Sequence, residues 1–341
     1  MTLTRIFTRI FALLLLAGPG FAAEISSTGV GRTDPGVGCS LTLSGQITAG
    51  DADALARAIS QLQQTPGAND SLGVDNQIVL CLSSPGGSLV EGVALAEVIQ
   101  QFDATTRVGP DDACLSACAI AFMGGRLNTY SGAGWHPSRY LHPTSTLGFH
   151  APDLTIAEGD FTRADVMKAY RVAISALALV ANKAETLTMP QHLLTNMMNH
   201  VGDDFHYVDS IDLLALYGIQ LYGYEVPTRR RTVEPTLCAN LFEWTLDRPT
   251  ESPDLQQFQR YVDSFRFNQG SGNWEFEPFD GTMLCRVALN FELGGGPVDK
   301  VDMSEWSDFT NAFANRVLSP WARYPGLTPL RDVRLGNRRD F

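Results

Sequence analysis

The stretch from Gln77 to Gln101 places a strand pattern directly before a helix pattern, and it constrains the fold more than any other part of the chain. Residues 77–82 read QIVLCL, an uninterrupted apolar run typical of a strand buried on both faces of a parallel sheet. Residues 89–101 carry apolar side chains at helical spacing, and Ser-Pro-Gly-Gly separates the two patterns. A strand that leads straight into a helix predicts a parallel sheet with helical crossovers.

The same alternation of strands and helices extends to both sides of this stretch. We expect further strands at 39–47, 105–109 and 145–152, and further helices at 51–64, 116–125, 160–183, 190–200 and 210–219. Asp51 is expected to cap the first of these helices. The segment 116–125 is apolar on every side, which predicts a buried helix.

The character of the sequence changes near Tyr224. At 341 residues, the chain is long enough for two domains. We expect an α/β domain over 24–225, a linker over 225–235, and a smaller strand-containing domain over 226–341, where tryptophans and two cysteines stand among alternating apolar residues.

The N-terminus has the pattern of a secretory signal peptide. Arg5 and Arg9 precede an apolar run over 10–17, and small residues follow up to Ala22 and Ala23. The run is shorter than the roughly 20 residues that span a bilayer, so an N-terminal anchor is the weaker alternative. The sequence therefore predicts a signal peptide over 1–23 and a periplasmic or secreted protein without a stable membrane span.

Charge excludes one class of partner. The net charge is −12, and Lys168, Lys183 and Lys300 are the only lysines, so no basic stripe exists that would neutralise phosphates. The Arg229-Arg230-Arg231 triplet is too short to change this and is expected to be solvated. Nucleic acid is not an expected partner.

Six cysteines in an exported chain form an even set that can pair. Cys238 and Cys285 are the only cysteines in the C-terminal third, which favours their pairing. Pairing Cys114 with Cys118 is tight but plausible, and it leaves Cys39 with Cys81. The alternative is a zinc site from Cys114 and Cys118 with His136 and His142, but this spacing matches no common ligand pattern, so no metal is expected.

The consecutive glycines Gly86 and Gly87 allow close approach to backbone amides where a helix begins. A helix start favours negative charge, either a phosphate or a transient oxyanion. A phosphate loop needs a lysine, and none is near. The remaining alternatives are an oxyanion site and a tight turn without chemistry.

Two further residues stand at positions suited to chemistry. Ser116 opens the buried apolar helix, either as an N-cap or as a nucleophile whose neighbouring amide, that of Ala117, faces the attacked carbonyl. His150 ends a strand before Ala-Pro, either as a packed structural residue or as a base.

The stretches SSPGGSLVEGVALAEVI, CLSACAIAFMGG and LGFHAP resemble, in that order, the ClpP and signal-peptide-peptidase group of serine peptidases. The resemblance covers roughly 39–224 and implies a crotonase-like fold of repeated ββα units. It implies that Ser116 is the nucleophile, His150 the base, and the turn of Gly86 and Gly87 part of an oxyanion hole, with Gly87 and Ala117 donating. It also implies a peptide or protein substrate, no cofactor and a homo-oligomer.

The third catalytic residue is less well defined. The resemblance implies an aspartate on a later segment that orients the histidine, and the stretch GDDFHYVDSIDLLALYGI fits it, with Asp203 or Asp204 in that role. Each has the alternative of capping a helix or lying on the surface. Lys168 is the rival base, by analogy with the Ser-Lys peptidases of the same group, although Arg171 beside it suggests an exposed helix face.

Two further alternatives concern the function as a whole. An insertion over 125–145 is either a substrate-binding lid or an obstruction of the site. A catalytically silent binding or assembly protein is the alternative to a hydrolase. The thioester chemistry of other crotonase-like proteins is disfavoured by export, because coenzyme A is cytosolic.

Overall fold

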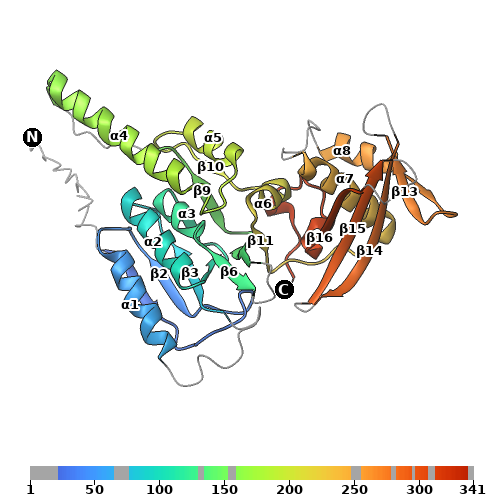
Figure 1. Cartoon of the computed structure of the whole chain (residues 1–341), viewed down its shortest axis with the longest axis horizontal. Coiled ribbons are helices and arrows are strands. Elements are labelled where there is room, and N and C mark those ends of the chain that lie inside the picture. Colours follow the sequence, from blue (N-terminus) through green and yellow to red (C-terminus); the bar gives the residue numbers. More distant parts are fainter. Residues whose placement is uncertain are drawn as a thin grey trace, which may run out of the picture.

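A computed structural model describes residues 22–64, 77–129, 134–152, 159–246, 255–277, 282–293, 296–305 and 312–336 (Figure 1). These residues form a mixed α/β structure, which confirms the predicted class, and their strands make four sheets. Residues 1–21 of the predicted signal peptide lie outside the described part. No helix within the described residues is long and apolar enough to cross a membrane.

The largest sheet has six strands and carries the N-terminal half. Its first strand runs antiparallel to the second, and all the others are parallel, as a sheet built by helical crossovers requires. In spatial order the strands are β1 (Glu24–Ser27), β2 (Leu41–Ser44), β3 (Val79–Ser83), β4 (Thr105–Val108), β8 (Arg139–Leu141) and β11 (Gln220–Leu221).

Helices α1 (Asp51–Gln63) and α2 (Leu89–Gln101) follow β2 and β3 and pack side by side, as Figure 1 shows. The expectation that Asp51 caps α1 is wrong: Gly50 occupies the cap position, and the Asp51 carboxylate accepts the Thr48 N–H at 2.7 Å. The first amides of α1 are satisfied instead by Glu91 of α2, which accepts the Ala52 N–H at 2.7 Å. A helix end that lacks its own cap is thus completed by a neighbouring helix.

A second, three-stranded sheet carries the residues of interest. Its order is β10 (His206–Tyr207), β9 (Thr146–Phe149) and β5 (Ala113–Leu115), with β9 and β5 parallel. Helix α3 (Ala117–Phe122) begins directly after β5, and all its residues are buried, as the apolar pattern predicts. Helices α5 (Gln191–Asn199) and α6 (Ile211–Tyr217) flank β10 along the chain.

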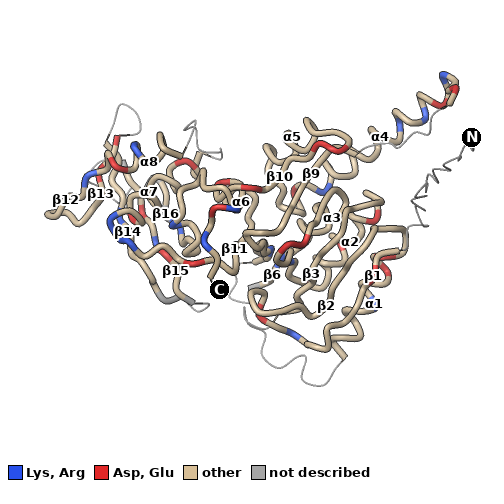
Figure 2. Tube along the Cα trace, turned by 180° about the vertical axis from the view of Figure 1, so that it is seen from behind, with Lys and Arg blue, Asp and Glu red and all other residues tan. Residues whose placement is uncertain are grey.

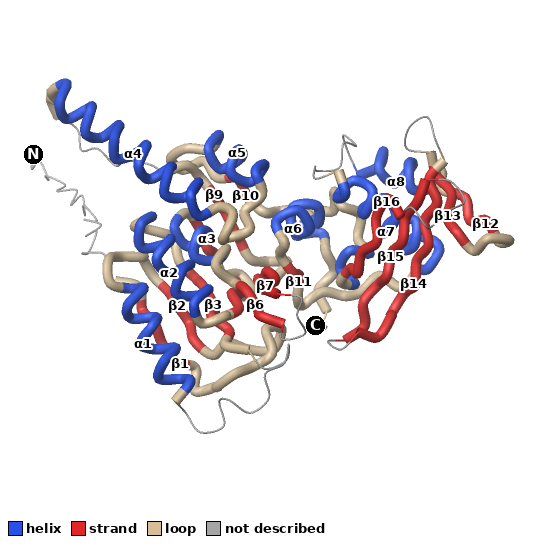
Figure 3. The backbone as a smooth tube through the Cα atoms, in the orientation of Figure 1, coloured by secondary structure: helices blue, strands red, loops and turns tan. Residues whose placement is uncertain are grey.

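Helix α4 (Arg163–Lys183) projects from the body, as Figures 1 and 3 show. It is capped by Thr162, whose hydroxyl accepts the Asp165 N–H. Val180 is its only fully buried residue. Exposed apolar side chains lie along it, namely Val166, Met167, Tyr170, Val172 and Ile174.

The C-terminal half is built on an antiparallel five-stranded sheet, the strand-containing unit that the sequence predicts. Its order is β12 (Arg266–Asn268), β13 (Asn273–Phe276), β14 (Met283–Leu293), β15 (Gly296–Glu305) and β16 (Ala312–Leu318). Helices α7 (Arg230–Thr245) and α8 (Leu255–Asp263) accompany it.

The predicted linker over 225–235 is wrong in its second half. Helix α7 begins at Arg230, and both Glu234 and Pro235 are buried. The Glu234 carboxylate is satisfied there by Arg230 and by the indole N–H of Trp274. Burial of Glu234 against Trp274 of the sheet overrides the local sequence signals of a linker.

The last described segment of the chain also connects the two halves. After the five-stranded sheet, a segment over 325–336 bonds back to the first half, with the Asp212 N–H donating to Gly326 O and the Glu225 N–H to Arg334 O, both at 2.8 Å. At the base of this segment, Arg323 forms a buried ion pair with Asp299 at 2.7 Å.

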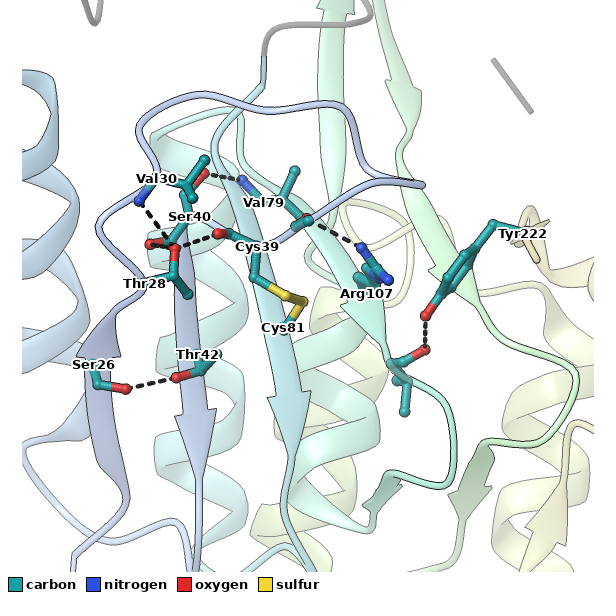
Figure 4. The surroundings of a disulfide bond; sticks show 12 residues. Ser26, Thr28, Val30, Cys39, Ser40, Thr42, Val79, Cys81, Arg107 and Tyr222 are labelled. Atoms are coloured by element: carbon teal, nitrogen blue, oxygen red, sulfur yellow. Dashed lines mark hydrogen bonds between the residues drawn. A yellow bond between two sulfur atoms is a disulfide. The ribbon is translucent and has the colours of Figure 1, made fainter. Parts of the chain in front are cut away.

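Three disulfides are present, and they are the expected pairs: Cys39–Cys81, Cys114–Cys118 and Cys238–Cys285. Figure 4 shows the first, which fastens the segment before β2 to β3. The second brackets Ser116, and the third joins α7 to β14. Because Cys114 and Cys118 are bonded to each other, they have no thiolates to offer the alternative zinc site.

The insertion over 125–145 forms a hairpin of β6 (Arg126–Thr129) and β7 (Gly134–Pro137), followed by β8. Trp135 of the hairpin donates its indole N–H to Asp103, at the end of α2. Arg139 of β8 is fully buried and donates to the carbonyl oxygens of Met123 and Leu187. The described part of the insertion is therefore anchored on the body of the fold.

Candidate active site

The Pro-Gly-Gly turn lies between β3 and α2, and both of its glycines are required by close packing. Gly86 has φ +98°, and a Cβ added there would lie 2.7 Å from the Ser116 Cβ. Gly87 has φ +142°, and its Cβ would collide with the carbonyl oxygen of Ile47. The turn thus touches Ser116 directly, which only a residue without a side chain permits.

Ser116 occupies a strained turn between β5 and α3. Its φ of +56° and ψ of −122° are unusual for a residue with a side chain, and its N–H donates to Gly148 O at 3.0 Å. Its hydroxyl makes no capping hydrogen bond, so the alternative of a simple N-cap is not realised. Strain of this kind is characteristic of functional sites, where the surroundings hold a side chain in place.

His150 contacts Ser116. Leu115 of β5 pairs with Gly148 of β9, so the residues that follow these parallel strands emerge at the same edge. The His150 Nε2 lies 2.6 Å from the Ser116 Oγ. This is within the reach that proton transfer requires. For Nε2 to accept the hydroxyl proton, the neutral imidazole must carry its own proton on Nδ1.

The second ring nitrogen of His150, Nδ1, does not contact a carboxylate among the described residues. Its Nδ1 is buried without a hydrogen-bond partner among the described residues, and the ring of Phe205 lies 4.5 Å away. The structure therefore does not bring Asp203 or Asp204 into hydrogen bonding with His150. The pairing of His206 with Phe149 sets the register of β10, and it is Phe205 that packs on the imidazole.

The two candidate aspartates differ in position. Both are exposed, but Asp203 lines the pocket at Ser116, whereas Asp204 does not, and the Asp204 backbone N–H donates to Val201 O at 3.2 Å. The two adjacent aspartates therefore have different surroundings, and the sequence does not reveal which of them borders the pocket.

Backbone amides for an oxyanion are available at both expected donor positions, Ala117 and Gly87. Ala117 is the first residue of α3, where an N–H has no intrahelical acceptor. Within the described residues, no hydrogen bond from the Gly87 N–H is found. The Gly86 N–H, in the same turn, donates to the Ser84 Oγ at 3.0 Å.

A pocket of about 520 Å³ opens beside Ser116 and His150. Its walls are mainly apolar and come from α2, α3, α4, α5 and the turn before β10, including Leu89, Val90, Ile120, Val172, Ala176, Met197 and Phe205. No described residue of the insertion over 125–145 lines it, so this part neither covers nor obstructs it. Lys168 is exposed on α4 and does not line the pocket.

A cluster of three histidines, His192, His200 and His206, was not predicted from the sequence. The ring centroids of His200 and His206 are 5.6 Å apart, and His192 stacks near Tyr217 at 4.9 Å. The His206 Nε2 lies 2.7 Å from the Tyr217 hydroxyl. Burial, with His200 and His192 nearby, lowers the pKa of His206 to about 4. The only sequence signal that could have indicated this cluster is the presence of three histidines within residues 192–206.

The described residues contain no cluster of histidine, cysteine or carboxylate side chains arranged to hold a metal ion. The fold and site together therefore define a mixed α/β protein with a Ser-His pair at an apolar pocket. Searches against protein-family models and curated protein sequences find no match to this chain.

Proposed function

We propose that this chain is an exported serine hydrolase, a peptidase of the ClpP and signal-peptide-peptidase type on a crotonase-like fold. The observation that carries the proposal is the 2.6 Å contact between His150 Nε2 and Ser116 Oγ at the mouth of a pocket. The parallel strands, the glycine turn against Ser116 and the buried helix behind it support the same class.

In the proposed reaction, His150 Nε2 takes the proton of Ser116 as its Oγ attacks the carbonyl carbon of a peptide bond. The resulting oxyanion accepts hydrogen bonds from the N–H groups of Gly87 and Ala117, each worth about a hundredfold or more in rate. His150 then gives the proton to the leaving amine, and water, activated by the same imidazole, hydrolyses the acyl-enzyme. No cofactor enters these steps.

Export is supported by two independent features. The first 23 residues have the signal-peptide pattern, and three disulfides pair all six cysteines. Disulfides are stable in the periplasm and outside the cell. The proposed reaction uses no ATP, which is consistent with a peptidase that acts outside the cytosol.

The alternatives differ in their support. Lys168 as base is disfavoured by its exposed position on α4 outside the pocket. The catalytically silent binding protein is favoured by one specific observation, the buried Nδ1 of His150 without a partner, because a base that lacks an orienting acceptor is less effective.

A fluorophosphonate probe tests the proposal on the folded protein. We expect covalent labelling at Ser116 that is lost in Ser116→Ala and at least about tenfold slower in His150→Ala. Ser175→Ala, an exposed serine of α4 outside the pocket lining, is the control and should label like the wild type. Absence of labelling in folded protein at every pH from about 6 to about 9 would favour the silent alternative.

A homo-oligomer is part of the proposal. Exposed apolar residues on α4 include Val166 at 57% and Tyr170 at 60% of their full accessibility. Such a surface on a projecting helix is typical of an interaction site. Since Val172 of the same helix lines the pocket, a second copy packed on α4 would also border the site.

A further inference from the structure

Among the described residues that line the pocket, Asp203 is the only carboxylate, and no described lysine, arginine or glutamate accompanies it there. The rest of the lining is mainly apolar, apart from Ser88, Ser116 and His150. Figure 2 draws the turn between α5 and β10, which holds Asp203 and Asp204, in red. A single charge at an apolar pocket sets which ligands the pocket favours.

The carboxylate of Asp203 has no partner within the described part of the chain. Asp203 is exposed to solvent, and no hydrogen bond or ion pair of its side chain is found among the described residues. Phe205, and not Asp203, packs on the imidazole of His150. Its neighbour Asp204 lies outside the pocket. Asp203 is therefore available to a ligand that enters beside Ser116.

A lysine or arginine side chain matches this combination of surfaces. Its methylene stem contacts apolar walls while its cationic head reaches a carboxylate at the edge. A purely apolar side chain would leave Asp203 unused, and an acidic one would be repelled. The net charge of −12 also favours the approach of cations.

We propose that Asp203 is a specificity residue that binds the cationic side chain of a lysine or arginine in the peptide substrate, next to the bond that Ser116 attacks. The inference rests on the proposed peptidase function for its reaction, but its binding component does not depend on turnover. It assigns Asp203 to the substrate, in place of the orienting role toward His150.

Kinetics with a matched pair of peptides test the proposal. One peptide carries lysine at the residue whose carbonyl is attacked, and the other carries norleucine, which has a similar chain without the ammonium. We expect the wild type to prefer lysine in kcat/KM by about tenfold, as a charge-assisted hydrogen bond provides. The preference should weaken as salt is raised.

In Asp203→Asn the preference for lysine should disappear. The loss should come from a higher KM for the lysine peptide and not from a lower kcat. Asp204→Asn is the matched control, because it removes the same charge one residue away and outside the pocket, and it should keep the preference. Asp203→Lys should favour glutamate over lysine at the same peptide position. An equal fall of kcat for both peptides in Asp203→Asn would overturn the proposal, because it would show that the carboxylate serves His150.

Binding to Ser116→Ala protein separates this inference from the peptidase proposal. We expect calorimetry to show the lysine peptide binding about tenfold more tightly than the norleucine peptide, and the difference to vanish when Asp203→Asn is added. Equal binding of both peptides to Ser116→Ala would overturn the assignment of Asp203. Failure of the fluorophosphonate to label Ser116 would overturn only the peptidase.

Discussion

Cys114 and Cys118 close a disulfide across the turn that carries Ser116, at a sequence separation of 4. Both cysteines are fully buried. The bond links the end of β5 to the first turn of α3, and Ser116 stands between them with a positive φ. The crosslink thus restrains the backbone on both sides of the proposed nucleophile.

Removing this disulfide in Cys114→Ser/Cys118→Ser should slow fluorophosphonate labelling of Ser116 by about tenfold or more, because small displacements of a nucleophile reduce its reactivity strongly. The free energy of unfolding should fall by about 2 kcal/mol, as the short loop predicts. Stopped-flow labelling and denaturant unfolding measure the two effects.

The control is Cys238→Ser/Cys285→Ser, which opens a loop with a sequence separation of 47 and should cost about 4 kcal/mol in the free energy of unfolding. The folded fraction of this variant should label at the wild-type rate. If the longer-loop variant loses labelling as much as the shorter one, the positioning role of Cys114–Cys118 is wrong.

Gly86→Ala should inactivate the site. The added Cβ would lie 2.7 Å from both the Ser116 Cβ and the Leu115 carbonyl oxygen. The turn that carries Ser116 must therefore move. We expect labelling to slow by at least about a hundredfold. Gly50→Ala is the matched control: Gly50 also has a left-handed φ of +100°, but nothing lies within 4 Å of its added Cβ.

For Gly50→Ala we expect a loss of about 1 kcal/mol in the free energy of unfolding from backbone strain, with labelling unchanged. Labelling of Gly86→Ala at the wild-type rate would show that the contact between the turn and Ser116 is not needed.

Much of this arrangement follows from local sequence signals. Leu89–Gln101 forms a helix over the expected residues because Ser88 caps it and its apolar spacing is regular. Ser116 and His150 come together because each follows a strand, and parallel neighbours end at the same edge. Topology alone therefore brings two distant residues into contact.

The parts that the sequence does not reveal depend on tertiary packing. The register of β10 on β9 decides whether Phe205 or a carboxylate meets His150, and no local signal encodes it. The burial of Glu234 in α7 depends on Trp274, 40 residues away. The histidine cluster likewise arises only when α5, α6 and β10 pack together.

Acidification should destabilise the fold through His206. Its pKa in the folded chain is about 4, below the ordinary 6.5, because burial disfavours the imidazolium. The unfolded chain binds more protons between these two values, so the stabilisation is complete above about 6.5 and is lost as the pH falls through the folded pKa. The melting temperature should therefore drop from about pH 7 to about pH 5.

His206→Gln keeps a polar group toward Tyr217 but cannot take up this proton. We expect its drop in melting temperature over the same pH range to be smaller than that of the wild type by a few degrees. His136→Gln, at an exposed position on β7, is the control and should retain the wild-type drop. Equal drops in all three proteins would assign the pH dependence elsewhere.

The buried ion pair of Arg323 and Asp299 should stabilise the C-terminal half, to which both residues belong. Their side chains are 4% and 0% exposed, and Arg323 also donates to Asn290 Oδ1. Arg323→Met leaves Asp299 buried without its cation and should cost about 3–5 kcal/mol in the free energy of unfolding. Denaturant unfolding measures this loss.

The partly exposed pair Lys300 and Asp302 provides a comparison, because a partly solvated pair is worth about 1 kcal/mol or less. Lys300→Met should therefore change the free energy of unfolding little. The double variant Arg323→Met/Asp299→Leu should recover part of the loss of Arg323→Met. A loss no larger for Arg323→Met than for Lys300→Met would contradict the role assigned to the buried pair.

Assembly through α4 gives the last prediction. Met167 and Tyr170 are 43% and 60% exposed in the single chain, and a second copy would bury them. Introducing charge by Met167→Asp/Tyr170→Asp should shift the protein from oligomer to monomer in light scattering, because an unpaired carboxylate in an apolar interface is costly. Ser175→Asp adds one carboxylate at an exposed polar position of α4 and should affect assembly less than either single variant, Met167→Asp or Tyr170→Asp. A wild-type protein that is monomeric at all tested concentrations would remove the oligomer proposal, while leaving the Ser116–His150 contact and its labelling test unaffected, since both residues come from one chain.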